Sequence, residues 1–264
     1  MEKKNQLIKI TDESYFADSA INFSTMKELL GSARNFQYAR TTVKEPTASM
    51  QLGSAIHCAI LEKDVFANEY VACPEIDKRT KEYKEFASAN AGKKLYKASE
   101  VEPILETIEK CDYSNGLNLI KSGSCITENA IFWDCGTVNM KCKIDAYDKD
   151  TQTLIDVKTT TDVSPTTFQR LIFNNNYHLQ LAHYYNGLTS CNLGVNEFLI
   201  VAIQTQAPYD VVEYRLSAEV IKEACSIVNK LYDKLENVML FNDNSGYSTE
   251  PITVELPKWY VSNN

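Results

Sequence analysis

The sequence has no apolar stretch long enough to span a membrane, and its first residues, MEKKNQLIKITDESYF, do not contain the apolar segment of a signal peptide. It also lacks a Cys-x-x-Cys pair, although it contains 8 cysteines. These absences argue against a membrane protein, a secreted protein and a zinc or iron–sulfur protein. We therefore expect a cytoplasmic protein whose cysteines are mostly buried small hydrophobes in a reducing compartment.

An excess of positive charge is also missing, since the formal net charge is −8. An acidic protein is a poor candidate for coating nucleic acid, but this value is compatible with a basic groove on an acidic surface, because the local potential decides contact with DNA. With 264 residues, 44% hydrophobic and 23% charged, the composition is that of a globular protein able to bury a large core.

The hydrophobic pattern predicts one domain, residues 1–264, with a mixed α/β fold around one sheet. Residues 1–120 are expected to be mainly helical, with helices over 24–39 (Ser24 as N-cap), 51–62 and from a Ser99–Glu102 capping box to about 113. Residues 121–264 are expected to hold the sheet and its flanking helices, with strands over 125–133, 137–147, 153–159, 196–205 and 209–216.

Residues 141–160, KCKIDAYDKDTQTLIDVKTT, predict a β-hairpin with a polar turn between two alternating strands. If the turn is centred on 150–151, Asp145 lies opposite Asp156 on one face of the sheet, and Lys158 lies on that face two residues on. Two facing carboxylates repel each other unless a cation lies between them, and hard oxygen ligands suit Mg²⁺ or Mn²⁺. A surface hairpin with an Asp–Lys ion pair explains the same pattern equally well.

Two expected helices carry further candidates. His57 lies four residues after Gly53 on the same helical face, and imidazole can complete a carboxylate metal site, although a lone histidine in an apolar helix is more often a core residue. Tyr177, Gln180 and Tyr184 share one face of a later helix, where ordinary packing is the simpler explanation.

Glu128, in the strand ITENAIFW, is either a further ligand or a solvent-facing side chain. Four cations are candidates for contacts with DNA phosphates, which position a duplex without reading its sequence. They are Lys78, Arg79 and Lys81 in a basic loop over 74–84, and Arg170 on the helix after the hairpin. The alternative for these cations is a solvated protein surface.

Five ordered motifs together resemble the RecB-type branch of the PD-(D/E)XK nuclease superfamily: Gly53-x-x-x-His57, Glu128, Ile144-Asp145, Asp156-Val157-Lys158 and Gln180-x-x-x-Tyr184. Longer stretches, including LGSAIHCAILEKDVFANEY, LIDVKTTTDVSPTTFQR and NNNYHLQLAHYYNGL, are similar to the C-terminal nuclease domain of RecE (exonuclease VIII) and its phage and prophage relatives. The resemblance runs from about residue 10 to the final LPKW. It implies a restriction-endonuclease-like fold, a mixed β-sheet flanked by helices.

The resemblance also implies an activity and partners. It predicts digestion of linear double-stranded DNA in the 5′→3′ direction with Mg²⁺, or Mn²⁺ in its place, which leaves 3′ single-stranded overhangs for recombination by strand annealing. The expected assembly is a homo-oligomeric ring that threads DNA, with a tetramer favoured, and the expected partner is a RecT-like single-strand annealing protein. The expected setting is the cytoplasm of a bacterial host, with the protein encoded by a phage or prophage.

The roles implied by the resemblance are metal ligation by His57, Asp145, Asp156 and the Val157 carbonyl, with Glu128 as a further candidate ligand. Catalysis is implied for Lys158 with Asp145, Asp156, Gln180 and Tyr184. The sequence departs from the family at Ile144, where proline is usual, and at Lys143, where arginine is frequent. Neither position is a metal ligand, so we expect the chemistry to be retained.

Two other functions fit parts of the pattern. A CRISPR-adaptation-like or RecB-like nuclease of the same fold often carries an iron–sulfur cluster on cysteines near its C-terminus, where this chain has only Cys225 beyond the core. The second alternative is a non-catalytic protein that binds DNA ends, and the intact Asp156-Val157-Lys158 motif argues against it.

Overall fold

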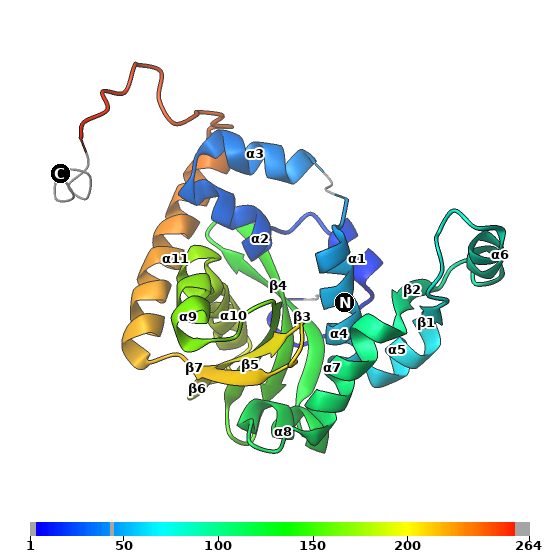
Figure 1. Cartoon of the computed structure of the whole chain (residues 1–264). Coiled ribbons are helices and arrows are strands. Elements are labelled where there is room, and N and C mark those ends of the chain that lie inside the picture. The colour runs from blue at the N-terminus through cyan, green and yellow to red at the C-terminus, as the bar shows by residue number, and fades with distance from the viewer. Residues whose placement is uncertain (1–3, 43–44, 257–264) are drawn as a thin grey trace.

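A five-stranded mixed sheet forms the centre of the computed structural model, which describes residues 4–42 and 45–256 (Figure 1). The strands lie in chain order: β3 (Ile126–Cys135), β4 (Val138–Asp148), β5 (Thr153–Thr160), β6 (Glu197–Gln204) and β7 (Val211–Arg215). Neighbouring strands are antiparallel except β5 and β6, which are parallel and are connected through α9 (Pro165–Asn174) and α10 (Tyr177–Ser190). The expected mixed α/β fold and its five strands are confirmed.

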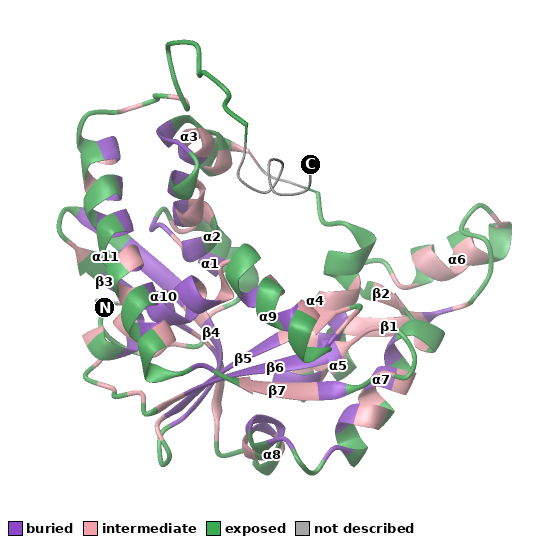
Figure 2. Ribbon diagram, turned by 60° about the vertical axis from the view of Figure 1, so that its left-hand side comes forward, coloured by how far each residue is buried: buried purple, intermediate pink, exposed green. Residues whose placement is uncertain are grey.

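Helices cover both faces of this sheet, because its central strands are apolar on both sides (Figure 2). In β5, Leu154 joins one core, while Ile155 and Val157 join the other. The larger core contains residues of α9, α10, α11 (Ala218–Leu240), α2 (Phe23–Met26), η1 (Lys27–Leu30) and α3 (Ala33–Thr41). The smaller core contains residues of α4 (Ala48–Leu61), α7 (Ala98–Lys110) and α8 (Asn115–Ser122). No helix of the described residues has both the length and the apolar character needed to cross a membrane.

The helix expected over 24–39 is divided into α2, η1 and α3, so this prediction was wrong. Asn22 caps α2 in place of the expected Ser24, because its side-chain oxygen accepts a backbone hydrogen bond of 2.9 Å. Ser32 then caps α3 by accepting a hydrogen bond of 3.1 Å from the Asn35 N–H. A polar side chain that caps a new helix offers the backbone an alternative to continuing the old one.

A small arm projects beside α4 and α7 (Figure 1). It contains α5 (Lys63–Glu69) and the parallel strands β1 (Tyr70–Cys73) and β2 (Lys94–Lys97), with α6 (Lys81–Ala89) between the strands. The loop expected over 74–84 therefore ends at Thr80, whose hydroxyl caps α6. The capping box expected at Ser99 does not form, since the Ser99 N–H donates to Glu75 at 2.9 Å and α7 begins at Ala98.

A buried lysine attaches the N-terminal helix α1 (Asp12–Ala17) to the sheet. Lys141 of β4 is 4% exposed, and its ammonium group donates to the backbone carbonyls of Tyr15 at 2.6 Å and Asp18 at 2.8 Å. Burial lowers the pKa of Lys141. The carbonyls at the end of the helix replace the water that the ammonium group has lost.

We expect Lys141→Met to lower the free energy of unfolding by about 2 kcal/mol, because two charge-assisted hydrogen bonds inside the protein are lost. Urea denaturation followed by circular dichroism measures this change. Lys4→Met is the matched control, since the Lys4–Asp134 ion pair is exposed and its loss should cost less than about 1 kcal/mol. Equal stability of Lys141→Met and the wild type would contradict the role of this ammonium group.

Candidate active site

The hairpin of β4 and β5 brings two carboxylates to one place. Ala146 pairs with Ile155, which is the register predicted from the sequence, and the next positions along the hairpin are Asp145 and Asp156. Regular pairing ends there, because the Asp145 side chain accepts the hydrogen bond of the Val157 N–H at 2.7 Å. The Asp145 carboxylate is thereby fixed against β5.

The alternation of faces along β4 breaks at the same place. Ile144 and Tyr147 both lie in the larger core, whereas Ala146 lies in the smaller one. On β3, the position opposite Asp145 in the register is Glu128, which has a φ of 52°. A non-glycine residue in this left-handed region costs about 1–3 kcal/mol, and such strain concentrates at functional sites. The distortion of both strands brings the two acidic side chains together.

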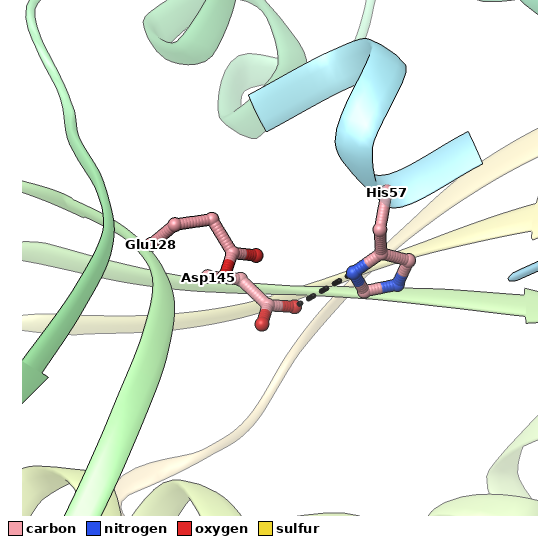
Figure 3. Close-up of side chains that lie close together, drawn as sticks. All are labelled: His57, Glu128 and Asp145. Carbon is pink, nitrogen blue, oxygen red and sulfur yellow. Dashed lines mark ion pairs between the residues drawn. The ribbon is translucent and has the colours of Figure 1, made fainter. Parts of the chain in front are cut away.

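His57 reaches the same place from α4. This helix can lie close to β5 because Gly53 leaves room: a Cβ at this residue would lie 3.0 Å from Thr159 Oγ1. One turn later, His57 Nδ1 lies 3.7 Å from Asp145 Oδ2 (Figure 3). The Gly-x-x-x-His spacing thus has a physical reason, since the glycine permits the approach on which the histidine contact depends.

One donor atom from each of His57, Glu128 and Asp145 lies within 4.8 Å of the others (Figure 3). Asp156 is outside this group, because its carboxylate, 0% exposed, pairs with Lys158 Nζ at 2.5 Å. The expected ligands Asp145 and His57 therefore lie together with Glu128, the further candidate ligand. The expected ligand Asp156 faces the lysine.

Burial makes this a site of poorly compensated negative charge. It raises the pKa of Glu128 to about 7, with Asp145 adding to the shift and Lys143 opposing it. It also raises the pKa of Asp145, and takes the pKa of Asp156 to about 6 although Lys158 acts against this shift. The Lys158 ammonium group, 2.5 Å from Oδ2, is the charged partner of the Asp156 carboxylate.

The donor set fits a hard divalent cation. Burial lowers the pKa of His57 to about 4, so the imidazole is neutral at pH 7 and offers a lone pair. Carboxylate oxygens with one imidazole suit Mg²⁺ or Mn²⁺, and the cluster of His57, Glu128 and Asp145 contains no thiolate that would favour a softer metal. The Asp156 carboxylate, fully buried with Lys158 as its charged partner, also fits a cation at this place.

Lys143 links this site to the N-terminal helix. Its ammonium group contacts Glu128 Oε2 and Asp12 Oδ1, both at 2.6 Å. Burial alone would lower the pKa of Lys143, but the two carboxylates outweigh burial and raise this pKa. The sequence marked Lys143 only as a departure from the family and gave no signal for Asp12, because 131 positions separate the two residues.

Gln180 and Tyr184 face the same region from α10. Gln180 Nε2 donates to the Tyr184 hydroxyl at 2.6 Å, and burial raises the pKa of that hydroxyl, with the site carboxylates adding to the shift. Both residues line a cavity of about 300 Å³ that reaches the site, since Lys143 is part of its wall. Other residues of the wall are Phe16, Ser24 and Ser54.

Three of the four cations expected to contact DNA lie together on the arm, and the fourth lies on α9. Lys78 and Arg79 lie in the loop of the arm and Lys81 begins α6, while Arg170 is exposed on α9. Arg79 is held by Asp77 at 2.5 Å, and Lys81 pairs within α6 at 3.5 Å. None of the four lines the cavity or forms an ion pair with a site carboxylate in the described residues.

Comparison with known proteins relates this geometry to a family. A family model described as a PDDEXK-like domain of unknown function matches residues 22–251. No curated protein matches the chain. Among solved structures, a candidate exonuclease from Eubacterium rectale has a TM-score of 0.64 at 15% identity, over 97% of this chain and 94% of the other.

Two further structures have lower scores. LHK-Exo in complex with dAMP has a TM-score of 0.40 at 15% identity, over 88% of this chain and 96% of the other. A phage-related exonuclease from Haemophilus somnus has a TM-score of 0.30 at 15% identity, over 70% of this chain and 94% of the other. At these identities the Eubacterium rectale structure shows the fold alone, and the other two scores are too low to carry an argument. The family match extends from α2 to beyond α11 and includes His57, Glu128 and Asp145, so the chain belongs to the PDDEXK-like family.

Proposed function

We propose that this protein is a divalent-metal-dependent exonuclease that digests linear double-stranded DNA in the 5′→3′ direction. The observation that carries the proposal is the convergence of His57, Glu128 and Asp145 within 4.8 Å, beside the buried Asp156–Lys158 pair. Metal-assisted phosphodiester hydrolysis uses this combination of hard oxygen ligands and a fixed cation. Membership of a PDDEXK-like family and a fold shared with a candidate exonuclease support it.

The metal would be held by His57, Glu128 and Asp145, with Asp156 and the Val157 carbonyl as adjoining oxygen donors. A bound Mg²⁺ or Mn²⁺ supplies a water of lowered pKa and neutralises charge on the phosphate. The protein contributes an arrangement in which one donor atom from each of His57, Glu128 and Asp145 lies within 4.8 Å of the others, with backbone strain at Glu128.

We assign to Lys158 the contact with the reacting phosphate. Its ammonium group lies 2.5 Å from Asp156 and 3.5 Å from the Val157 carbonyl oxygen. Burial alone would lower the pKa of Lys158, but Asp156 and Asp145 outweigh burial and raise this pKa. The ammonium group therefore stays charged at neutral pH. A fixed ammonium group beside the phosphate would orient the attacking water and stabilise the negative charge that develops.

The cavity next to the site favours action at a DNA end. Its volume of about 300 Å³ lies at the lower end of the range for small-ligand sites. Ser24, Ser54 and Gln180 line it and offer hydrogen bonds to a terminal phosphate, while Lys143 in the wall is paired with Asp12 and Glu128. A 5′ phosphate held there would bring the adjoining phosphodiester toward the carboxylates, as 5′→3′ digestion requires.

The biological setting rests on the resemblance of the sequence motifs. Loss of nucleotides from 5′ ends leaves 3′ overhangs, the substrate for a RecT-like annealing protein during phage or prophage recombination in a bacterial cytoplasm. A homo-oligomeric ring, with a tetramer favoured, would enclose the duplex, and the net charge of −8 fits an acidic exterior around a basic channel. A strict monomer in light scattering would contradict the ring.

Duplexes blocked at one type of end test activity and polarity together. With Mg²⁺, we expect digestion when the 3′ ends are blocked and none when the 5′ ends are blocked. Asp156→Asn and Lys158→Met should each lower the rate at least about 10²-fold, because each removes a group beside the reacting phosphate. Asp134→Asn is the control, since this carboxylate is 52% exposed. A wild-type rate in Asp156→Asn would sink the assignment.

The raised pKa values of Glu128 and Asp156 predict how the stability of the metal-free protein depends on pH. A carboxyl whose pKa is higher in the folded state stabilises the fold fully below its unfolded pKa of about 4. This contribution is lost as the pH rises through about 6 for Asp156 and about 7 for Glu128.

Metal binding should show the opposite dependence, because it needs the ionised carboxylates. We expect Mn²⁺ to raise the melting temperature more at pH 8 than at pH 6 in scanning fluorimetry, and Glu128→Gln to weaken this difference. The same stabilisation at both pH values in the wild type would show that these carboxylates do not bind the ion.

The double variant Lys78→Ala/Arg79→Ala tests whether the arm binds DNA. We expect weaker duplex binding and a slope of log affinity against log salt that is smaller by about 1–2, since each phosphate contact contributes about 0.9. Fluorescence anisotropy with Asp156→Asn protein measures binding without digestion. Lys110→Ala, at an exposed ion pair on α7, is the control. An unchanged slope would remove the arm from the DNA-binding surface.

A further inference from the structure

Lys158 has an aromatic neighbour that the sequence motifs do not include. Its ammonium group lies 5.1 Å from the centre of the Tyr177 ring. The Lys158 side chain is 16% exposed, so this contact is largely shielded from water. A cation within about 6 Å of an aromatic face is attracted by the ring quadrupole, and the attraction grows as water is excluded.

The Tyr177 ring is itself held by other rings. It packs against Phe168 of α9 with 6.4 Å between ring centres. Phe168 is 0% exposed and stacks on Tyr214 of β7, with 4.8 Å between centres and an angle of 28°. A row of three rings therefore extends from an edge strand of the sheet to the ammonium group of Lys158.

The turn between α9 and α10 sets the direction of this ring. Asn176 has a φ of 61°, and α10 begins at Tyr177 directly after it. Asparagine tolerates this left-handed conformation better than most residues, which allows a tight connection between the two helices. Asn175 Nδ2 then donates to the Tyr177 hydroxyl at 3.1 Å. The ring is thus held by its packing against Phe168 and, at its hydroxyl, by a hydrogen bond.

We propose that Tyr177 is a positioning residue that keeps the Lys158 ammonium group in the active site when a metal ion engages Asp156. A cation at that carboxylate competes with the ammonium group for the same oxygens and repels it. The face of the Tyr177 ring is not a ligand for a hard cation, so this contact persists while the ion pair weakens. The inference rests on the proposed nuclease function for its catalytic consequence.

Kinetics with Mg²⁺ test that consequence. Tyr177→Leu should lower kcat about tenfold, the size expected for a shielded cation–π contact, and leave KM within about twofold. Tyr177→Phe keeps the ring face and should restore most of the rate. Tyr185→Leu is the matched control, since Tyr185 lies on the same helix but packs on Phe198 at 5.8 Å. Equal loss in Tyr177→Leu and Tyr177→Phe would overturn the inference, because the hydroxyl rather than the ring would then matter.

A double-mutant cycle in metal-free protein tests the contact without activity. Tyr177→Leu, Lys158→Met and the double variant are compared by urea denaturation, and we expect the double variant to lose less stability than the sum of the single losses. Additive losses overturn the inference. The two proposals fail differently: a wild-type rate in Asp156→Asn defeats the nuclease assignment, whereas a wild-type rate in Tyr177→Leu, with Asp156→Asn inactive, defeats only the role of Tyr177.

Discussion

The burial of the Asp156 carboxylate determines which charged groups must lie next to it in the candidate active site. The carboxylate has 0% exposure, and the Lys158 ammonium group, 2.5 Å from Oδ2, is the ionic partner that offsets its charge. An isolated buried charge is costly enough that proteins pair it or protonate it. The pKa of about 6 shows that the lysine compensates only in part. A divalent cation at this place would offset the remaining deficit.

The sheet is distorted in a way that increases this deficit. In regular pairing, the Val157 N–H would donate to a backbone carbonyl, but here it donates to the Asp145 carboxylate. Glu128 takes a left-handed conformation opposite Asp145, at a cost of about 1–3 kcal/mol. Both features place acidic groups together at the expense of the metal-free fold. Stability is given up where the candidate chemistry is concentrated, as expected of a functional site.

The parts of the site that could be predicted from the sequence are those set by short spacings. The hairpin register follows from a turn and two alternating strands within about twenty residues, and the Gly53–His57 face follows from one helical turn. The position of Asp156 outside the group of three ligand candidates was not predictable from the hairpin pattern, which placed Asp156 opposite Asp145.

The contacts between distant segments of the chain could not be predicted from the sequence either. The bridge from Asp12 through Lys143 to Glu128 joins two distant segments of the chain, and no local pattern encodes it. The helix propensity of residues 24–39 favours one continuous helix. The prediction missed its division because Asn22 and Ser32 each cap the start of a separate helix. The nuclease hypothesis itself depended on the order of five motifs, since composition and charge alone fit many globular proteins.

The attachment of α1 by Lys141 has a consequence for the order of synthesis. Lys141 and the Tyr15 carbonyl that it binds are 126 positions apart. Because a chain leaves the ribosome from its N-terminus, α1 emerges long before β4 exists to receive it. The ion pair between Asp12 and Lys143 can form only after β4 has been synthesised. The bridge to Glu128 is therefore completed when the earliest part of the chain joins one made much later, and a nascent chain that stops before β4 has no such bridge.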